Sequence, residues 1–161
     1  MIKSDRLWAP WRIDYVQAKK PKGCIFCQAV RNKRDFVVFR TKYSVVMLNI
    51  FPYNNGHLMV SPLRHVNDTA KLNQAEVVDL FAAINTAKDL LQAVLKPQGF
   101  NVGINLGRAA GAGITGHLHI HIVPRWAGDT NFMPITAHAK VISQSLKELH
   151  RKLSHAYARS N

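Results

Sequence analysis

Acidic residues, cysteines and long apolar runs are all scarce in this sequence. Of its 161 residues, 9 are Asp or Glu against 22 Lys or Arg, so the formal net charge is +13. No run approaches the roughly 18 consecutive apolar residues of a membrane-spanning helix, so we expect no membrane partner. The two cysteines form one C-x-x-C and cannot link distant segments, and the first residues lack the apolar core of a secretory signal. We therefore expect a reducing, cytoplasmic location.

The positive charge is concentrated at the two ends of the chain. Residues 1–42 carry a net charge of +8, residues 43–116 of +1 and residues 117–161 of +4. Such a field attracts polyanions, including nucleotides and nucleic acids, but a solvated basic surface explains it equally well. Aromatic side chains interleaved with Lys and Arg would support nucleic-acid binding, and only the start of the chain comes close to that pattern. A nucleic-acid partner is therefore not favoured.

The hydrophobic pattern predicts five strands and two main helices. The expected strands are residues 36–40, 43–50, 57–61, 100–106 and 117–123, which are short and rich in β-branched residues or alternate polar with apolar ones. We predict an α+β fold with an antiparallel five-stranded sheet and a helix across one face. The whole chain, residues 1–161, is expected to form one domain, in which residues 1–34 are an irregular N-terminal arm that carries the C-x-x-C.

Capping and spacing locate the two helices. Asn73, with Glu76 three residues later, predicts a helix N-terminus, and Lys96-Pro97 ends that helix. Its expected apolar face includes Val77, Leu80, Phe81, Ile84, Leu91, Val94 and Leu95. A second amphipathic helix, with a basic outer face, is expected from about Ala137 through Ile142, Leu146, Leu149 and Leu153.

Three histidines alternate with aliphatic residues in the segment H-L-H-I-H-I-V. On a strand, alternate side chains share a face at intervals of about 7 Å, so His117, His119 and His121 would lie together while the aliphatic residues enter the core. An imidazole is largely unprotonated near neutral pH, so it offers a nucleophilic nitrogen, and a neighbouring imidazole can protonate a leaving oxygen. The pattern indicates either a metal site or nucleophilic and acid–base catalysis, and the three histidines are compatible with both.

A loop rich in small residues comes directly before these histidines. Residues 105–113, N-L-G-R-A-A-G-A-G, contain three Gly and three Ala. Such a backbone can approach a ligand closely and turn its N–H groups toward an anion. A glycine-rich loop is a weak signal alone, but its position here would bring a phosphate and a nucleophile together.

The segment H-L-H-I-H-I-V resembles the His-φ-His-φ-His-φ-φ motif of the histidine triad family of nucleotide hydrolases and transferases. Further segments are similar to the bacterial branch of that family related to diadenosine tetraphosphate phosphorylases: W-A-P-W-R at 8–12, C-I-F-C at 24–27, N-I-F-P-Y-N-N-G-H at 49–57, P-R-W at 124–126 and G-D-T-N-F at 128–132. The similarity extends over nearly the whole chain. It implies an HIT-like fold, a homodimer, and an adenine nucleotide or dinucleoside polyphosphate as substrate.

The resemblance also implies roles for individual residues. Within the catalytic triad of His117, His119 and His121, His119 would attack an α-phosphorus to form a nucleotidyl-histidine, and His121 would contact the phosphate and assist the leaving group. Water or inorganic phosphate would then discharge the intermediate. The other implied contacts are Asn49 to the ribose, His57 in support of the triad, Asn105 with Gly111, Ala112 and Gly113 at the phosphate oxygens, and Trp126 at the phosphate pocket.

One departure from the family pattern affects the choice between hydrolysis and phosphorolysis. Many members carry Gln and Ser or Thr donors in the loop before the triad, where this sequence has Ala112-Gly113. Water and inorganic phosphate therefore both remain candidates for the nucleophile that discharges the intermediate. Two further alternatives are a non-enzymatic nucleotide- or zinc-binding interaction module and a deadenylase that acts on adenylylated nucleic-acid ends.

The C-x-x-C fits either a redox pair or half of a zinc site. A structural zinc site typically combines two thiolates with two imidazoles. The histidines outside the reacting pair are His57, His65, His117, His138, His150 and His155. The resemblance to zinc-bearing relatives implies Cys24, Cys27, His65 and His117 as ligands of a structural zinc.

Overall fold

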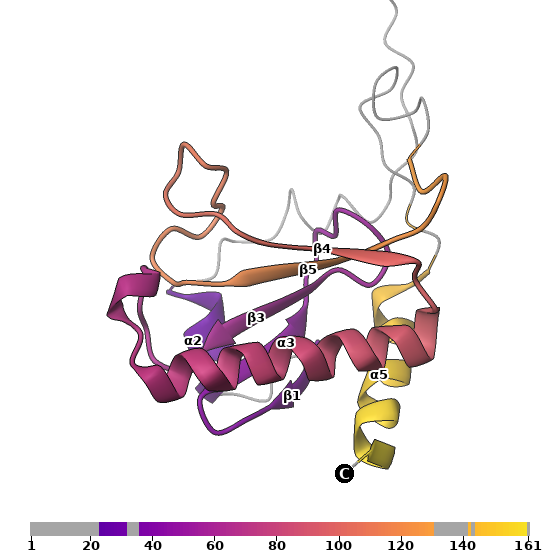
Figure 1. Cartoon of the computed structure of the whole chain (residues 1–161), viewed down its shortest axis with the longest axis horizontal. Helices are drawn as coiled ribbons and strands as arrows, with labels where there is room; N and C mark the ends of the chain where they lie inside the picture. The colour runs from indigo at the N-terminus through magenta and orange to yellow at the C-terminus, as the bar shows by residue number, and fades with distance from the viewer. Residues whose placement is uncertain (1–22, 32–35, 131–141, 143, 161) are drawn as a thin grey trace, which may run out of the picture.

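A five-stranded antiparallel sheet forms the centre of the molecule (Figure 1). The computed structural model describes residues 23–31, 36–130, 142 and 144–160. The strands are β1 (Val37–Arg40), β2 (Ser44–Leu48), β3 (Leu58–Pro62), β4 (Gly99–Ile104) and β5 (Ile120–Arg125), and their order in the sheet is β1-β2-β3-β5-β4. The predicted α+β fold with an antiparallel five-stranded sheet is confirmed.

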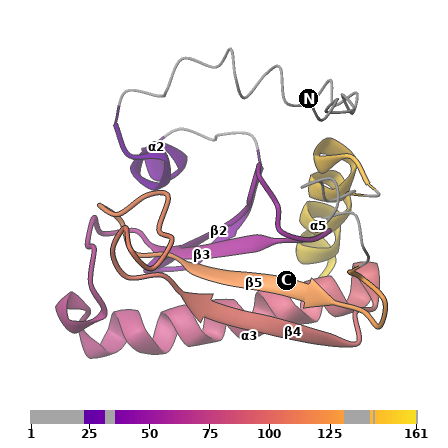
Figure 2. The ribbon, with the colours of Figure 1, turned by 90° about the horizontal axis from the view of Figure 1, so that it is seen from above.

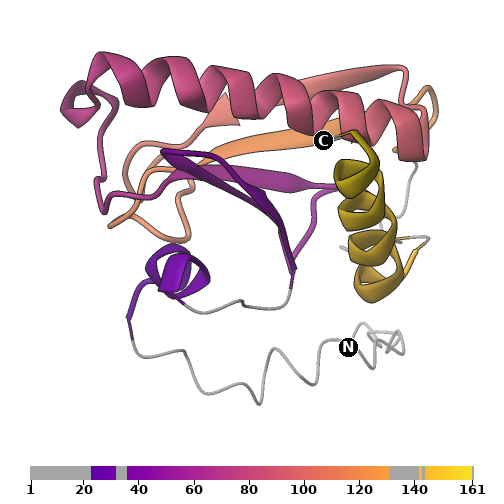
Figure 3. The same ribbon diagram turned by 90° about the horizontal axis from the view of Figure 1, so that it is seen from below.

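Within the described residues, three α-helices pack around this sheet. They are α2 (Ile25–Arg31), α3 (Gln74–Leu95) and α5 (Leu146–Ser160), and a short 3-10 helix, η1 (Thr69–Lys71), precedes α3. Figures 2 and 3 show α2 and α3 on opposite sides of the sheet and α5 beside one end of it. The α5 helix packs against α3 and β1. None of the helices in the described ranges is both long and apolar enough to cross a membrane.

The alternation of side chains divides the sheet into two buried faces. Val46, Leu48, Leu58, Val60 and the β5 residues Ile120 and Ile122 belong to the main core, which α3 and α5 cover. Met47 and Met59 point the other way and pack with Phe26 and Ala29 of α2. The β-sheet register places His121 directly opposite Met59. The face of the sheet that carries His121 is therefore the one that α2 partly covers.

The α3 helix begins as the sequence predicts. The Asn73 side chain accepts a hydrogen bond from the Glu76 backbone N–H, and the Glu76 carboxylate accepts one from the Asn73 N–H, which completes a capping box. Lys96 follows the last helical residue in the left-handed conformation (φ 50°). Two residues of the expected apolar face are not in the core: Val77 is 39% exposed and Phe81 is 63% exposed.

Three differences from the sequence prediction exceed a shift of one or two residues at a strand end. The expected irregular arm contains the seven-residue helix α2, because Phe26 and Ala29 gain full burial against the sheet. The α5 helix begins at Leu146 instead of near Ala137; most of the intervening segment, with His138, lies outside the described residues. The remaining part of the N-terminal arm, residues 1–22, also lies outside them.

The third difference concerns the strand that carries the histidines. β5 begins at Ile120, so His117 and His119 precede it. The neighbouring strand β3 ends in Pro62, which has no N–H to continue the backbone hydrogen bonds between β3 and β5. Beyond that point the Ser61 hydroxyl donates a hydrogen bond to the Leu118 carbonyl. The aliphatic residues between the histidines are nevertheless buried, as predicted.

Candidate functional site

Four histidine side chains lie buried on the sheet face opposite α3. His57 is 0% exposed, His117 1%, His119 5% and His121 9%. The centroids of the His119 and His121 rings are 4.9 Å apart, and those of His57 and His121 are 5.0 Å apart. The structure thus brings together the two predicted reacting histidines and the predicted supporting one. Buried imidazoles need hydrogen-bond partners, and these partners determine which nitrogen of each ring carries the proton.

His57 determines the tautomer of His121. His57 Nδ1 accepts the Tyr53 backbone N–H at 3.1 Å and lies 3.3 Å from the Asn49 amide nitrogen. The proton of neutral His57 is therefore on Nε2, which lies 2.9 Å from His121 Nδ1 and donates to it. His121 in turn carries its proton on Nε2 and presents this N–H as a donor.

Burial keeps both rings of this pair neutral. Desolvation, with smaller contributions from His121 and His119, lowers the pKa of His57 from 6.5 to about 3. Desolvation and the neighbouring His119 lower the pKa of His121 to about 4. Because both pKa values lie well below 7, chiefly through burial, the pair stays uncharged at neutral pH. His121 can therefore act as a neutral hydrogen-bond donor toward an oxyanion or leaving oxygen.

His119 is held in the opposite tautomer. Its Nδ1 lies 2.9 Å from the backbone carbonyl oxygen of His117 and donates to it. Nε2 therefore carries the lone pair, which makes it the nucleophilic nitrogen of the ring. A nucleophile and a donor from adjacent imidazoles can together cleave a phosphate ester by covalent catalysis with acid assistance.

Phe26 is a site residue that the sequence analysis missed. Its ring is 5.0 Å from that of His119, with an interplanar angle of 29°, and 5.2 Å from that of His117. It lies on α2 within the C-I-F-C segment and is fully buried. Its position inside the C-x-x-C was the only available signal, and this signal does not distinguish Phe26 from the half-buried Ile25 beside it.

The four predicted metal ligands gather at the end of this face. Cys24, Cys27, His65 and His117 have ligand atoms that all lie within 4.8 Å of one another. Cys24 Sγ is 3.1 Å from His117 Nδ1, Cys27 Sγ is 3.1 Å from His65 Nδ1, and the two Nδ1 atoms are 3.2 Å apart. Ligand atoms around a tetrahedral zinc would be separated by about 3.3 to 3.8 Å. The spacing fits a four-ligand Cys/His metal site.

The protonation of His117 also fits a metal ligand. Its Nε2 lies 2.9 Å from the Pro62 carbonyl oxygen and donates to it, so Nδ1 has the free lone pair that faces the two thiols. Burial lowers the pKa of His117, which favours the neutral form that a metal requires. The chemistry of the donor set therefore fits Zn²⁺, and the group would tie α2 to the loop after β3 and to the histidine segment.

An ion pair fixes the loop that carries His65. Both nitrogens of the Arg64 guanidinium fork donate to the two oxygens of Glu76, at 2.8 and 2.7 Å, and one also donates to the Lys71 carbonyl. The Arg64 partner holds the pKa of Glu76 down at about 2. The capping box of α3 is thus connected directly to the residue before His65, one of the predicted metal ligands.

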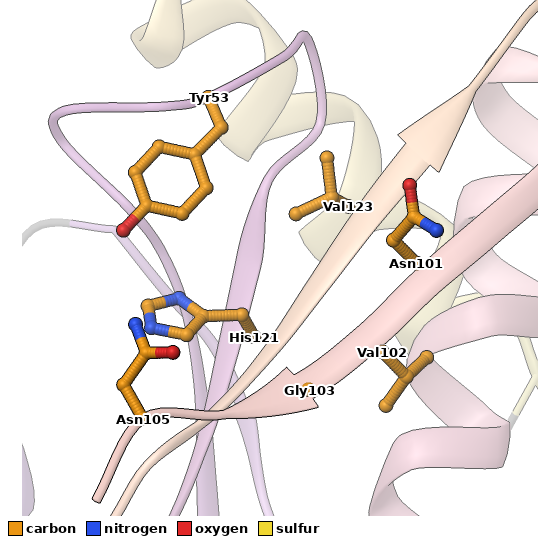
Figure 4. A pocket seen from close by; sticks show the side chains of 7 residues that line it. All are labelled: Tyr53, Asn101, Val102, Gly103, Asn105, His121 and Val123. Carbon is orange, nitrogen blue, oxygen red and sulfur yellow. The ribbon is translucent and has the colours of Figure 1, made fainter. Parts of the chain in front are cut away.

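The glycine-rich loop offers fewer free amides than its sequence suggests. The Gly111 N–H donates to the Arg108 carbonyl at 3.0 Å, and the Ala112 N–H donates to the Gly107 carbonyl at 3.3 Å. Both amides are thus used within the loop, while Gly113 lies exposed with open space around it. The side chain of Asn105, which begins the loop, lies beside His121 (Figure 4).

The two remaining predicted site residues are Asn49, which contacts His57, and Trp126, which directly follows β5. Asn49 shapes the loop after β2: its side-chain oxygen accepts the Phe51 N–H at 2.9 Å while its amide faces His57. Trp126 follows β5 and is half-buried, and its backbone N–H donates to Asp129. Asp129 also accepts hydrogen bonds from Arg125 and from Asn54, so it connects the segment after β5 to the β2–β3 loop.

A groove of about 220 Å³ opens beside His121 (Figure 4). Its lining residues are Tyr53, Asn101, Val102, Gly103, Asn105, His121 and Val123. Tyr53 comes from the β2–β3 loop, and the others come from β4, β5 and the start of the glycine-rich loop. Tyr53 and Asn101 are further site residues that the sequence analysis did not identify.

Comparison with known proteins gives consistent matches. The HIT domain family model matches residues 30–128 of the chain. The AP-4-A phosphorylase of Mycobacterium tuberculosis is 38% identical over 165 residues, which cover 96% of this chain and 85% of that protein. The asymmetrical bis(5'-nucleosyl)-tetraphosphatase of Schizosaccharomyces pombe is 34% identical over 93 residues, which cover 58% of this chain and 50% of that protein.

Solved structures agree with these matches. A Zn-bound histidine triad family protein from Mycobacterium smegmatis has a TM-score of 0.68 at 25% identity, covering 85% of this chain and 94% of that one. The NitFhit protein of Caenorhabditis elegans has a TM-score of 0.63 at 28% identity, covering 76% of this chain and 27% of that one.

Proposed function

Because this chain belongs to the HIT domain family, we propose that it is an enzyme that cleaves dinucleoside polyphosphates at an α-phosphorus through His119. One observation carries the proposal. His119 donates its Nδ1–H to the His117 carbonyl, so its Nε2 lone pair is free beside the N–H donor of His121. The curated relatives named above act, by their names, on Ap4A or on bis(5'-nucleosyl) tetraphosphates.

The first chemical step forms a P–N bond. His119 Nε2 attacks the α-phosphorus, and the bond from phosphorus to the bridging oxygen of the leaving polyphosphate breaks. His121 donates its Nε2 hydrogen bond to that oxygen and supplies the proton as needed. For diadenosine tetraphosphate the products of this step are an adenylyl-histidine and ATP.

The second step breaks the P–N bond and regenerates the free imidazole. Attack by water releases AMP, and attack by inorganic phosphate releases ADP. In this proposal Asn49 holds the ribose, Asn105 and Gly113 face phosphate oxygens, and Trp126 borders the phosphate pocket. Gly111 and Ala112 would contribute by their small size, since their amides bond within the loop.

Zinc is the metal that we propose for the Cys24, Cys27, His65 and His117 group. Two thiolates and two imidazoles are the preferred structural zinc ligands, and a Zn-bound protein is among the structural relatives. The metal, when bound, supplies a cross-link and no chemistry at the phosphate. Free thiols that serve as ligands need a reducing compartment, which supports a cytoplasmic location.

We also propose that the protein is a homodimer. β4 lies at the sheet edge, and within the described ranges no strand pairs with its outer side. Val102 and Ile104 of β4 are 46% and 39% exposed, and Val78 and Phe81 of the adjacent α3 are 64% and 63% exposed. An open edge flanked by large apolar side chains favours pairing with a second copy, which would extend the sheet.

The decisive experiment is a product analysis with diadenosine tetraphosphate, with and without phosphate. AMP plus ATP would identify hydrolysis, and ADP plus ATP formed only with phosphate would identify phosphorolysis. His119→Ala should abolish turnover, and rapid quenching with substrate labelled at the α-phosphorus should mark His119 in the wild type. Nucleotide binding with no turnover across several polyphosphates would refute the enzymatic proposal and leave a binding module.

A further inference from the structure

We propose that Asn54 and Asp129 are positioning residues for the reacting histidines. The hydrogen bond between their side chains holds the β2–β3 loop, residues 49–57, where its backbone sets the tautomer of His57. His57 in turn sets the tautomer of His121, which is the donor to the leaving oxygen. This inference rests on the function proposed above and concerns two residues to which that reaction assigns no step.

The β2–β3 loop closes on His57 with its own backbone. The Tyr53 N–H donates to His57 Nδ1 at 3.1 Å, and the His57 N–H donates to the Asn54 carbonyl at 3.2 Å. The rings of Tyr53 and His121 also lie side by side, with the centroids 5.5 Å apart (Figure 4). A shift of this backbone would remove the shorter of the two donor contacts that keep the proton of His57 on Nε2.

The Asn54 side chain connects this loop to the end of β5. It is 7% exposed, and its amide nitrogen donates to the Pro124 carbonyl at 3.0 Å and to Asp129 Oδ2 at 2.7 Å. Both hydrogens of the amide nitrogen are thus used. Gly56 lets the loop approach closely at the same place, since a Cβ there would meet Leu95 Cδ1 at 2.6 Å and Pro124 Cγ at 3.1 Å. The amide bonds and this close approach together set the distance between the loop and β5.

Asp129 is itself fixed by several donors. Its side chain is 6% exposed, and its carboxylate accepts from Arg125 Nε at 2.6 Å, from Arg125 Nη2 at 2.9 Å and from the Trp126 N–H at 3.1 Å. A bidentate guanidinium fixes the orientation of a carboxylate. Arg125 Nη1 also donates to Asn101 Oδ1 of β4 at 2.6 Å. The acceptor that Asn54 uses is therefore held by the sheet.

The next residue in the loop offers a natural comparison. The Asn55 amide nitrogen lies 3.5 Å from the Gln144 side-chain oxygen, and the buried Asn55 Oδ1 accepts no hydrogen bond from the part of the chain that the structure describes. Two asparagines in one turn thus differ in what they contact. Asn54 connects the turn to β5, and Asn55 faces the segment before α5.

The first test determines the tautomers of the histidines in the protein without substrate. Long-range ¹H–¹⁵N correlation spectra distinguish a protonated ring nitrogen from an unprotonated one, and the wild type should show an unprotonated Nδ1 in His57 and in His121. Asn54→Ala should give a mixture of tautomers in both rings. His119 is an internal reference, because its Nδ1 proton is held by the His117 carbonyl and should stay in place. Asn55→Ala is the matched control and should give the wild-type tautomers.

The second test is kinetic and uses diadenosine tetraphosphate. Because a misplacement of about 1 Å can lower a rate about 100-fold, Asn54→Ala should lower kcat on the order of 10- to 100-fold while KM changes less than about threefold. Asn55→Ala should keep both constants at their wild-type values. Asp129→Asn keeps the size of the side chain but leaves one oxygen for donors that now use two. It should change the tautomers and kcat in the same direction as Asn54→Ala, by a smaller factor.

The outcomes separate positioning from general support of the fold. Wild-type tautomers in Asn54→Ala would overturn the proposal, whether or not kcat falls. Loss of the His119 tautomer in the same variant would overturn it as well, because Asn54 would then support the whole site. If Asn54→Ala does not fold, the same readings on Asp129→Asn decide. A wild type that cleaves no dinucleoside polyphosphate would refute the proposed function, while the tautomers still decide the positioning role.

Discussion

The ring of Phe26 stacks on the ring of His119, with the centroids 5.0 Å apart and the planes at 29°. Phe26 lies between Cys24 and Cys27, so the segment that carries two of the proposed metal ligands also packs against the proposed nucleophile. The backbone of His117, another metal ligand, accepts the Nδ1 hydrogen bond of the same imidazole. The His119 ring is thus oriented from two sides by the metal-binding group.

Substitution of Phe26 should therefore reduce turnover without removing substrate binding. Phe26→Leu keeps an apolar side chain but loses the ring contact, worth about 0.5 to 1.5 kcal/mol, so kcat should fall roughly 2- to 10-fold with KM little changed. Phe39→Leu is the matched control, because Phe39 is equally buried and stacks on Tyr157 away from the site. Equal kcat values for the two variants, at comparable thermal stability, would contradict a positioning role for Phe26.

His57 should make stability depend on pH. Its folded pKa of about 3 lies below the unfolded value of about 6.5, so the unfolded chain binds more protons in between. The contribution of neutral His57 is fully present above about pH 6.5 and is lost progressively as the pH falls toward 3. His57→Gln should flatten the pH dependence of the free energy of unfolding in this window, measured by urea titration from pH 7 to 4.5. A parallel pH dependence in both proteins would show that His57 is not the group responsible.

The metal group should be necessary for full stability. Purified protein should contain about one zinc per chain by elemental analysis, and Cys27→Ser should lose it. A loss of about 3 to 5 kcal/mol corresponds to a decrease in Tm of roughly 5 to 20 °C for a chain of this size. His155→Ala, an exposed α5 position outside the group, should keep both metal and Tm. Metal-free protein with an unchanged melting curve would count against a structural zinc.

A charge introduced among the exposed apolar side chains of the proposed interface should separate the two copies of the dimer. Phe81→Lys places a charge on the exposed apolar face of α3 beside Val78, and light scattering after size exclusion should report a monomer where the wild type gives a dimer. Ala158→Lys adds the same charge at an exposed position of α5, which packs against β1 at the opposite edge of the sheet, and should leave the dimer intact. A monomeric wild type, or a dimeric Phe81→Lys, would refute the interface.

Local signals in the sequence were sufficient for much of the fold. The Asn73–Glu76 capping box lies within four residues of sequence and gives the start of α3 correctly. The alternation around His119 correctly places Ile120 and Ile122 in the core. Periodicity, however, could not show that Phe81 is exposed, because the same apolar spacing serves a core or a surface strip.

The features that the sequence analysis missed depend on contacts between distant segments. The seven-residue helix α2 has no detectable period, and the burial of Phe26 against the sheet stabilises it. The stacking of Phe26 on His119 and the groove at Tyr53 bring together residues far apart in the chain, which spacing alone cannot specify. The metal group was anticipated from family resemblance, and the structure places its four ligand atoms together.

Pro62 has a consequence beyond ending a strand. Its carbonyl oxygen points toward the histidine segment, and in an antiparallel ladder a residue's N–H would point to the same side, where proline has none. An ordinary residue at this position would offer a donor that could draw the chain before Ile120 into regular pairing. We expect that His117 would then be part of the regular strand, with its imidazole away from the two thiols. A single missing hydrogen thus leaves the His117 imidazole facing the two thiols, while the next histidine of the same short stretch stays available for the proposed phosphate chemistry.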